Sequence, residues 1–158
     1  MKKLLLCLPV LLLLLLCACG EKSVPAPSKA ELPAPEALAA ELQASGAFAE
    51  ELVLAENDVG CFLYGLVESD APEMRYYFSS GAVADEIAIL PCADDAALEK
   101  VKSECATRLD LQTQLFTSYK PEEVPKLEKA LVLQRDKTVV LCVAADYEKA
   151  REILDKYF

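Results

Sequence analysis

Apolar residues follow two patterns along this chain, an unbroken run at the start and periodic positions afterwards. Lys2 and Lys3 precede a run of 15 mostly aliphatic residues that ends at Ala18. A membrane-spanning helix needs about 20 apolar residues, whereas the apolar region of a secretory signal needs about 7–15. The pattern therefore predicts that residues 1–18 are an export signal peptide.

The residues at the end of the run indicate the type of signal. Leu16, Cys17, Ala18 and Cys19 place an aliphatic residue at −3, a small residue at −1 and a cysteine at +1. This arrangement resembles the lipobox of bacterial lipoproteins. The resemblance implies that the Cys19 thiol carries a diacylglyceryl group and that the mature protein is anchored in the cell membrane, on its extracytoplasmic face. An uncleaved anchor and a secreted protein cleaved near Gly20 are the alternatives.

A proline-rich segment separates Cys19 from the periodic part of the chain. Four of the nine prolines lie between residues 19 and 36, and this segment has no hydrophobic period. Such a composition is typical of an extended, semi-rigid linker. We therefore expect a tether over residues 19–36 and a single domain over residues 37–158, a length that suits one hydrophobic core.

The first half of the domain mixes helical and strand-like patterns. Leu38, Ala39 and Leu42 share a helical face, and Gly46 ends that helix. Residues 48–53 continue with helical spacing, residues 57–60 form a break, and the apolar residues 62–66 fit either type of element. Aromatic and aliphatic runs then predict strands over residues 74–78 and 86–90, with a turn between them.

The longest periodic segment predicts a helix over residues 96–119, capped by Asp94 or Asp95 and ended by Pro121. Its buried stripe is expected to contain Leu98, Val101, Cys105, Leu109, Gln112, Leu115 or Phe116, and Tyr119. Its solvent-facing side is expected to carry Glu99, Lys102, Ser103, Arg108 and Asp110.

Two apolar runs near the end of the chain predict a hairpin over residues 131–134 and 138–144, with a short turn at residues 135–137. Asp146 then caps a last helix. Paired hairpins indicate an α+β fold in which helices pack on one face of a mostly antiparallel four-stranded sheet, in the order α-ββ-α-ββ-α. The strand order within the sheet is left open.

Several short segments resemble one group of bacterial lipoproteins. They are Ser80-Gly81-Ala82 with Asp85-Glu86-Ile87-Ala88, Tyr119 with Pro121-Glu122-Glu123-Val124, Leu127-Glu128, the apolar hairpin, and the terminal Tyr157-Phe158. On these residues the chain is similar to domain-of-unknown-function family 4358, over roughly residues 38–158. The resemblance implies a small, lipid-anchored, extracytoplasmic domain, and it carries over no catalytic or ligand-binding residues.

Composition and charge exclude several classes of function. The formal net charge is −10, from 16 Lys and Arg against 26 Asp and Glu, which argues against a nucleic-acid partner. The chain contains no His, so a Ser-His-Asp triad, a Cys-His dyad and a histidine-ligated metal site are impossible. There is no glycine-rich phosphate loop and no calcium-binding loop motif.

The four cysteines of the domain, Cys61, Cys92, Cys105 and Cys142, allow two interpretations. None of them forms a C-x-x-C motif, and the pattern places Cys105 on the buried helical stripe and Cys142 in a core strand. We favour buried free thiols, while at least one disulfide remains the alternative for an exported chain.

Other candidate sites have simple structural explanations. The acidic pairs Glu50-Glu51, Asp85-Glu86, Asp94-Asp95 and Glu122-Glu123 are interpreted as helix caps or parts of a solvated acidic face. Residues 79–81 are interpreted as a turn rather than an anion site, and residues 76–78 as a strand whose aromatic side chains alternate between core and surface.

The sequence therefore favours a lipid-anchored binding or accessory module without cofactor or metal, attached through Cys19 and serving an unidentified protein or envelope partner. The alternative is a cell-envelope enzyme, a hydrolase or a thiol redox protein, whose site forms only in the folded chain.

Overall fold

A computed structural model describes residues 29–158, so the predicted signal peptide, Cys19 and the first half of the tether lie outside the described residues. Within this range the chain forms a five-stranded sheet in the order β1-β2-β3-β5-β4, and every neighbouring pair is antiparallel. The strands are β1 (Val53–Leu54), β2 (Arg75–Phe78), β3 (Glu86–Pro91), β4 (Leu131–Arg135) and β5 (Thr138–Val143).

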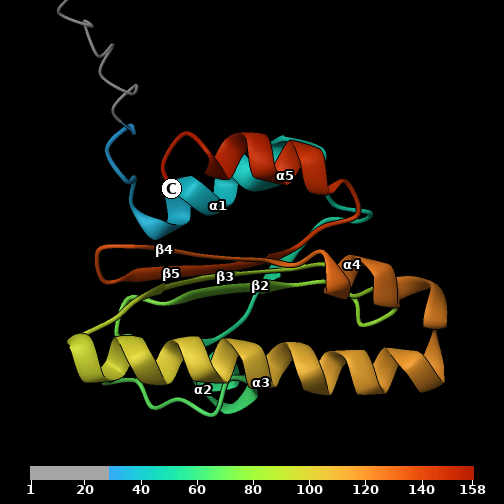
Figure 1. Ribbon diagram of the computed structural model, residues 1–158, viewed down its shortest axis with the longest axis horizontal. Coiled ribbons are helices and arrows are strands. Elements are labelled where there is room, and N and C mark those ends of the chain that lie inside the picture. The colour runs from blue at the N-terminus through green and yellow to red at the C-terminus, as the bar shows by residue number, and fades with distance from the viewer. Residues whose placement is uncertain (1–28) are drawn as a thin grey trace, which may run out of the picture.

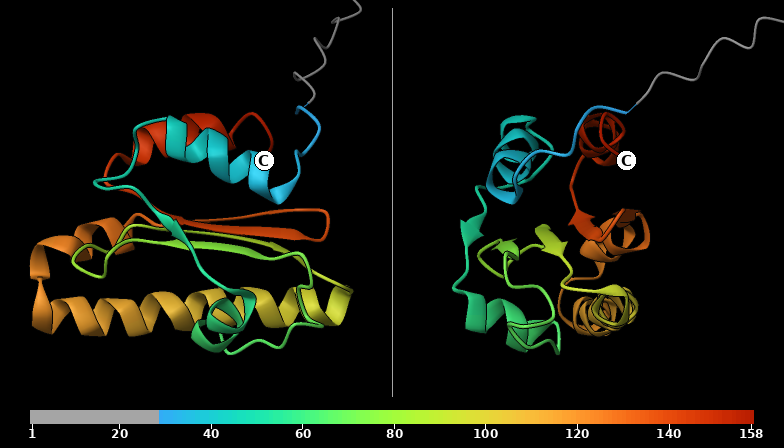
Figure 2. Two further views of the ribbon diagram at one scale, coloured as in Figure 1. Left: turned by 180° about the vertical axis from the view of Figure 1, so that it is seen from behind. Right: turned by 90° about the vertical axis from the view of Figure 1, so that its left-hand side faces the viewer.

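Helices cover both faces of the sheet, which gives three layers (Figures 1 and 2). One outer layer contains α1 (Pro35–Ala44) and α5 (Tyr147–Leu154), and the other contains α2 (Asn57–Leu63) and α3 (Asp95–Tyr119). A 3-10 turn (Pro121–Glu123) and α4 (Val124–Glu128) lead from the end of α3 back to the sheet.

The prediction of helices on one face was wrong, and the inner strands explain why. β3 and β5 each contain five consecutive buried residues, so their side chains are apolar toward both faces and both faces must be covered. Alternate side chains enter two separate cores, one under α1 and α5 and one against α2 and α3. The first core includes Ile87, Ile89, Val140 and Cys142, and the second includes Ala88, Leu90, Val139, Leu141 and Val143.

The predicted α+β class is confirmed, but the sheet has five strands rather than four. Val53 and Leu54 form the edge strand β1, where helical spacing was expected, and the predicted break at Asn57 is the start of α2. Gly60 lets α2 approach the sheet, because a Cβ atom there would lie 2.9 Å from Cε of Met74 and 3.4 Å from Cβ of Tyr76. These contacts join residues far apart in sequence, so local periodicity does not reveal them.

The long helix and the hairpin match their predictions closely. The Asp94 carboxylate caps α3 by accepting from the Ala97 backbone N–H at 2.8 Å. Of Leu115 and Phe116, between which the helical pattern did not decide, Phe116 is the buried residue. Tyr119 was expected on the buried stripe but is 65% exposed. β4 and β5 are joined by a two-residue turn with Asp136 at φ +50°.

The end of the predicted tether lies against the domain. α1 begins at Pro35, two residues before the expected boundary, and Pro is well suited to the first turn of a helix. Leu32 packs against the core under α1 and α5, and the Ala30 backbone N–H donates to the Lys156 carbonyl at 2.8 Å. The chain therefore enters the domain on the α1–α5 layer (Figure 1).

Among residues 29–158, no helix is long and apolar enough to cross a membrane.

Candidate functional site

A pocket of about 220 Å³ opens between α3 and the ends of β2 and β3 that meet the loop of residues 79–84. Its walls are mainly apolar, and its floor is polar. The walls include Leu63, Phe78, Val83, Leu115 and Phe116, and the floor includes Tyr76, Glu86, Arg108 and Gln112. Four elements, α2, β2, β3 and α3, and one loop therefore contribute to a single concave surface.

Glu86 lies at the floor of this pocket and is 2% exposed. Tyr64 Oη donates to its Oε1 at 2.6 Å, and Tyr76 Oη donates to its Oε2 at 3.0 Å. Arg108 Nη2 donates to Oε2 at 2.7 Å, and Gln112 Nε2 donates to the same oxygen at 3.2 Å. A buried carboxylate is costly without partners, and these donors explain how the fold accommodates Glu86.

The positions of Glu86 and Arg108 correct two expectations. Asp85 and Glu86 were expected on a solvated acidic face, but β3 is an inner strand and both side chains are buried. Arg108 was expected on the solvent side of the long helix, yet its side chain is only 13% exposed. Arg108 follows Cys105 by three residues and precedes Gln112 by four, so helical spacing alone places it on the buried face. The sequence therefore contained this signal for Arg108, although not its partner.

Two tyrosine rings, those of Tyr64 and Tyr76, lie against the ion pair. The rings of Tyr64 and Tyr76 meet edge to face with centroids 5.5 Å apart, and Cζ of Arg108 lies 5.9 Å from each centroid. Burial, followed by the negative charge of Glu86, raises the pKa of both tyrosines, so they stay protonated and donate. Burial alone would lower the pKa of Arg108, but its hydrogen bonds and charge interaction with Glu86 raise it.

Two atoms of this network remain available to a ligand. Arg108 uses Nε and Nη2 for Glu86 and Tyr76, and its Nη1 has no partner among residues 29–158. Gln112 must turn Nε2 toward the carboxylate, which only accepts, so its Oε1 is left as a free acceptor. No buried side-chain nitrogen or oxygen in the described range lacks a partner, so both free atoms are accessible.

A second buried charge cluster holds the rim of the pocket. Lys126 Nζ donates to Asp85 Oδ1 at 2.8 Å and to Glu123 Oε2 at 2.7 Å. Glu123 also accepts from the Ala84 backbone N–H at 2.9 Å, and Asp85 accepts from the Ala49 backbone N–H at 2.5 Å. Burial alone would raise the pKa of Glu123, but the bonds from Lys126 and Ala84 outweigh it and lower the pKa. This cluster ties the rim loop to the 3-10 turn and α4.

The sequence had suggested that Glu123 belongs to a solvated acidic face. This expectation was wrong, because Glu123 is only 5% exposed. Residues 79–81, predicted as a turn, lie in the loop that connects the antiparallel strands β2 and β3. The Ser80 backbone N–H donates to Glu50, Ser79 Oγ donates to the Val83 carbonyl at 2.6 Å, and Gly81 has φ +86°. The backbone and side-chain groups of this loop thus form hydrogen bonds that fix the rim of the pocket.

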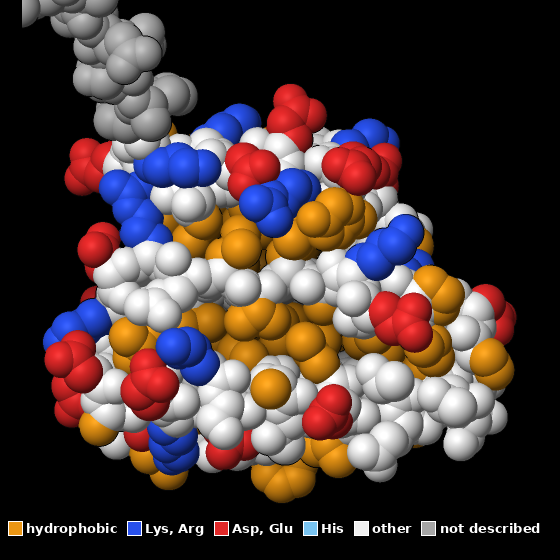
Figure 3. Space-filling model, viewed as in Figure 1, with side chains coloured by type: hydrophobic (Ala, Val, Ile, Leu, Met, Phe, Trp, Pro, Cys, Tyr) orange, Lys and Arg blue, Asp and Glu red, His pale blue; other side chains and the backbone are white. Residues whose placement is uncertain are grey.

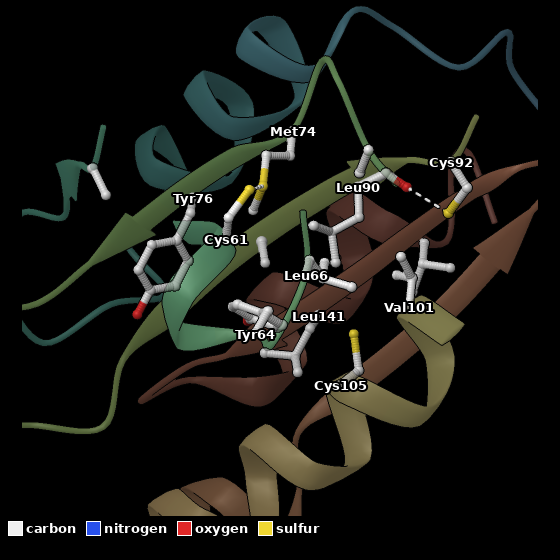
Figure 4. Packing of buried hydrophobic residues seen from close by; sticks show 14 of the residues in the cluster. Cys61, Tyr64, Leu66, Met74, Tyr76, Leu90, Cys92, Val101, Cys105 and Leu141 are labelled. Carbon is white, nitrogen blue, oxygen red and sulfur yellow. Dashed lines mark hydrogen bonds between the residues drawn. The ribbon is translucent and has the colours of Figure 1, made fainter. Parts of the chain in front are cut away.

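All four cysteines of the domain are buried free thiols. Figure 4 shows three of them, Cys61, Cys92 and Cys105. Burial raises the pKa of each thiol, to about 12 for Cys105 and for Cys142. Because the thiolate is the reactive form, these residues are poorly suited to nucleophilic or redox chemistry. Cys61 Sγ instead lies 3.7 Å from Sδ of Met74 in the core, and Cys92 Sγ donates to the Leu90 carbonyl at 3.4 Å.

The part of the chain that the structure describes contains no cluster of three or more Cys, Asp or Glu side chains arranged to hold a metal ion.

A family model described as "Domain of unknown function (DUF4358)" matches residues 62–144, more than half of the chain. The match includes β2, β3, α3, α4, β4 and β5, and with them Glu86, Arg108 and Gln112. No curated protein and no solved structure matches this chain.

Proposed function

This chain belongs to the DUF4358 family of domains of unknown function, and we propose, from the lipobox pattern at Cys19 and the pocket at Arg108, that it is a lipid-anchored, extracytoplasmic binding module whose ligand occupies that pocket. The observation that carries the proposal is the pair of free polar atoms on the pocket floor, Arg108 Nη1 and Gln112 Oε1, beneath apolar walls. Small-molecule sites typically combine apolar walls with a few fixed polar groups in this way.

The ligand is an amide attached to a small apolar group, such as one residue of a peptide. Arg108 Nη1 donates to the amide oxygen and Gln112 Oε1 accepts from the amide N–H. The pocket, of about 220 Å³, is small and therefore suits one apolar side chain and its amide rather than a larger ligand. Because Glu86 cancels the charge of Arg108, a neutral amide suits the floor better than a free carboxylate.

Ligand binding is tested with N-acetyl-leucinamide as the probe. We expect saturable changes in the side-chain NMR signals of Arg108 and Gln112, at about millimolar affinity for a ligand of this size. Val83→Phe fills the pocket and should abolish binding. Ala82→Phe changes an exposed neighbour outside the pocket lining and should bind as the wild type does. Equal binding by the two variants, or no saturable change in the wild type, would contradict the proposal.

The anchor rests on the lipobox pattern that ends at Cys19. Only the Cys19 thiol is expected to accept the lipid, so Cys19→Ser should yield an unprocessed or soluble product. Metabolic fatty-acid labelling and detergent-phase partitioning measure both properties. Equal lipid labelling of Cys19→Ser and the wild type would remove the lipid anchor from the proposal and leave the pocket unaffected.

A further inference from the structure

The structure also carries a second surface, separate from the pocket floor, on the edge of the sheet that β1 forms. We define it as the strap, residues 50–68, which runs down this edge from the α1–α5 layer to the α3 layer (Figure 2, left). Five of the nine large apolar side chains exposed among residues 29–158 lie in the strap. They are Val53, Leu54, Val59, Phe62 and Val67.

Phe62 is the most exposed of these apolar side chains. It is 84% exposed on α2, one turn from Val59, which is 42% exposed. Residues three apart on a helix are neighbours, so the two side chains form one apolar ridge. Single exposed apolar residues need no explanation, but a concentration of this kind is typical of an interaction site.

The charge of the strap is entirely negative. No Lys or Arg occurs between Lys29 and Arg75, a stretch that contains ten Asp and Glu residues. Within the strap, Glu51, Glu56, Asp58 and Glu68 are exposed, and none of them makes an ion pair with another described residue. The apolar ridge is therefore flanked by carboxylates that form no ion pair. Arg75 lines a surface hollow with Glu56, but its ion pair is with Glu36.

The opposite edge of the sheet is different. Residues 120–158, which include β4 and α5, contain eight acidic and eight basic residues. Figure 3 shows this side of the molecule, with Lys, Arg, Asp and Glu side chains interspersed. The β4 edge is therefore balanced in charge, whereas the strap carries carboxylates alone.

From this combination we propose that the strap docks a basic polypeptide segment with apolar side chains, held by Phe62 and Val59 and by the exposed carboxylates. A central apolar anchor surrounded by complementary charge is the usual composition of a protein–protein interface. An anionic bilayer surface fits poorly, because the unpaired carboxylates would repel it. The residues of the strap that would hold the segment, Val59 and Phe62 with Glu56 and Asp58, are not among those that line the pocket.

The test uses a fluorescent peptide of alternating Lys and Leu, followed by anisotropy at low and high salt. We expect binding that weakens with salt, and a loss of about tenfold or more for Phe62→Ser, as for an interface anchor. Glu56→Gln with Asp58→Asn should lower the affinity and flatten its salt dependence. A peptide of alternating Lys and Ser should bind at least about tenfold more weakly, because it lacks the apolar groups.

Matched variants on the opposite edge separate docking from general attraction to an acidic protein. Val132→Ser removes a 41% exposed apolar side chain from β4, and Glu148→Gln with Glu152→Gln removes two exposed carboxylates from α5. Both variants should bind the peptide as the wild type does. Equal losses for the two edges would overturn the proposal.

Two further measurements test the two other possible occupants of the strap, a lipid surface and a second copy of the chain. Binding to anionic vesicles that depends on Phe62 would overturn the proposal in favour of a lipid surface. Self-association in analytical ultracentrifugation that Phe62→Ser abolishes would overturn it in favour of a second copy of the chain. Peptide binding by the monomer, with no vesicle binding, supports it.

Discussion

At the scale of single residues, the least expected feature is a full ion pair inside the α3 layer. Glu86 and Arg108 are both largely withdrawn from solvent, with side-chain exposures of 3% and 13%. Such a pair adds little net stability compared with apolar residues, but removing one partner leaves a buried, uncompensated charge. Glu86 and Arg108 are therefore sensitive to single replacement and tolerant of joint replacement.

The first prediction concerns this asymmetry. Arg108→Met should cost about 3–5 kcal/mol of the free energy of unfolding, because the Glu86 carboxylate loses its counter-charge. The double variant Arg108→Met with Glu86→Gln should be more stable than the single variant. Lys102→Met, at an exposed position on the same helix, should stay within about 0.5 kcal/mol of the wild type. Denaturant unfolding at neutral pH measures all three. A single variant as stable as the Lys102→Met control would show that Glu86 is not buried.

The second prediction concerns acid sensitivity at Glu123. Its pKa is lowered in the folded state from a reference value of 4.5, so its contribution to stability is present above pH 4.5 and is lost as the pH falls through the folded-state pKa. Glu123→Gln should therefore be less stable than the wild type at neutral pH and should lose less stability between about pH 5 and about pH 3. The denaturant midpoint at each pH is the measurement.

Its control is the adjacent residue. Glu122 is exposed, so Glu122→Gln should follow the wild-type pH profile. A Glu123→Gln profile that declines as steeply as the wild type would mean that the contacts with Lys126 and Ala84 do not contribute to stability.

At the scale of elements, α3 shows how one helix combines two tasks. Its first half buries apolar side chains such as Val101 and Cys105, which are fully inaccessible to solvent. Its second half directs Arg108 and Gln112 at β3 and leaves Leu115 on the pocket wall, 59% exposed. The helix therefore contributes stability at one end and the candidate binding site at the other.

The third prediction compares two neighbouring positions of α3. Val101→Asp should destabilise by several kcal/mol, because it places an unpaired charge in the core. Lys102→Asp should stay within roughly 0.5 kcal/mol of the wild type, because position 102 faces solvent. Urea midpoints of the two variants provide the comparison, and equal shifts would show that the buried face of α3 is misassigned.

At the scale of the whole molecule, the segment before α1 belongs to the domain more than its composition indicates. Besides the contacts of Leu32 and Ala30, Arg135 Nη1 donates to the Tyr157 carbonyl at 2.8 Å and also to the Ala30 carbonyl. Residues 29–34 therefore connect the β4–β5 turn with the end of α5.

The fourth prediction locates the true start of the domain. A chain that begins at Lys29 should melt at the same temperature as one that begins at Cys19. A chain that begins at Ala37 lacks Leu32 and the first two residues of α1, and should melt several degrees lower, at roughly 2–8 °C per kcal/mol for a domain of this size. Differential scanning calorimetry of the three chains decides the matter. Equal melting temperatures for all three would confirm the boundary at residue 37.

What the sequence determined by itself was local. Periodicity and capping residues predicted the long helix after Asp94, the β4–β5 hairpin and the last helix after Asp146, because helices and tight hairpins satisfy their backbone groups within a short stretch of chain. The buried positions of Cys105 and Cys142 followed from the same patterns. The family resemblance also came from the sequence alone. It was expected over roughly residues 38–158, and the family model matches residues 62–144.

Tertiary structure alone decided the rest. β1 is recognisable as a strand only through its pairing with β2, and the second helical layer is required only once β3 and β5 lie inside the sheet. Arg108 could have been placed on the buried face from its spacing, but its partner Glu86 lies 22 residues earlier, on a different element. A charge can be buried only where a partner from elsewhere in the chain neutralises it. Local sequence does not show which distant residues come into contact in the fold.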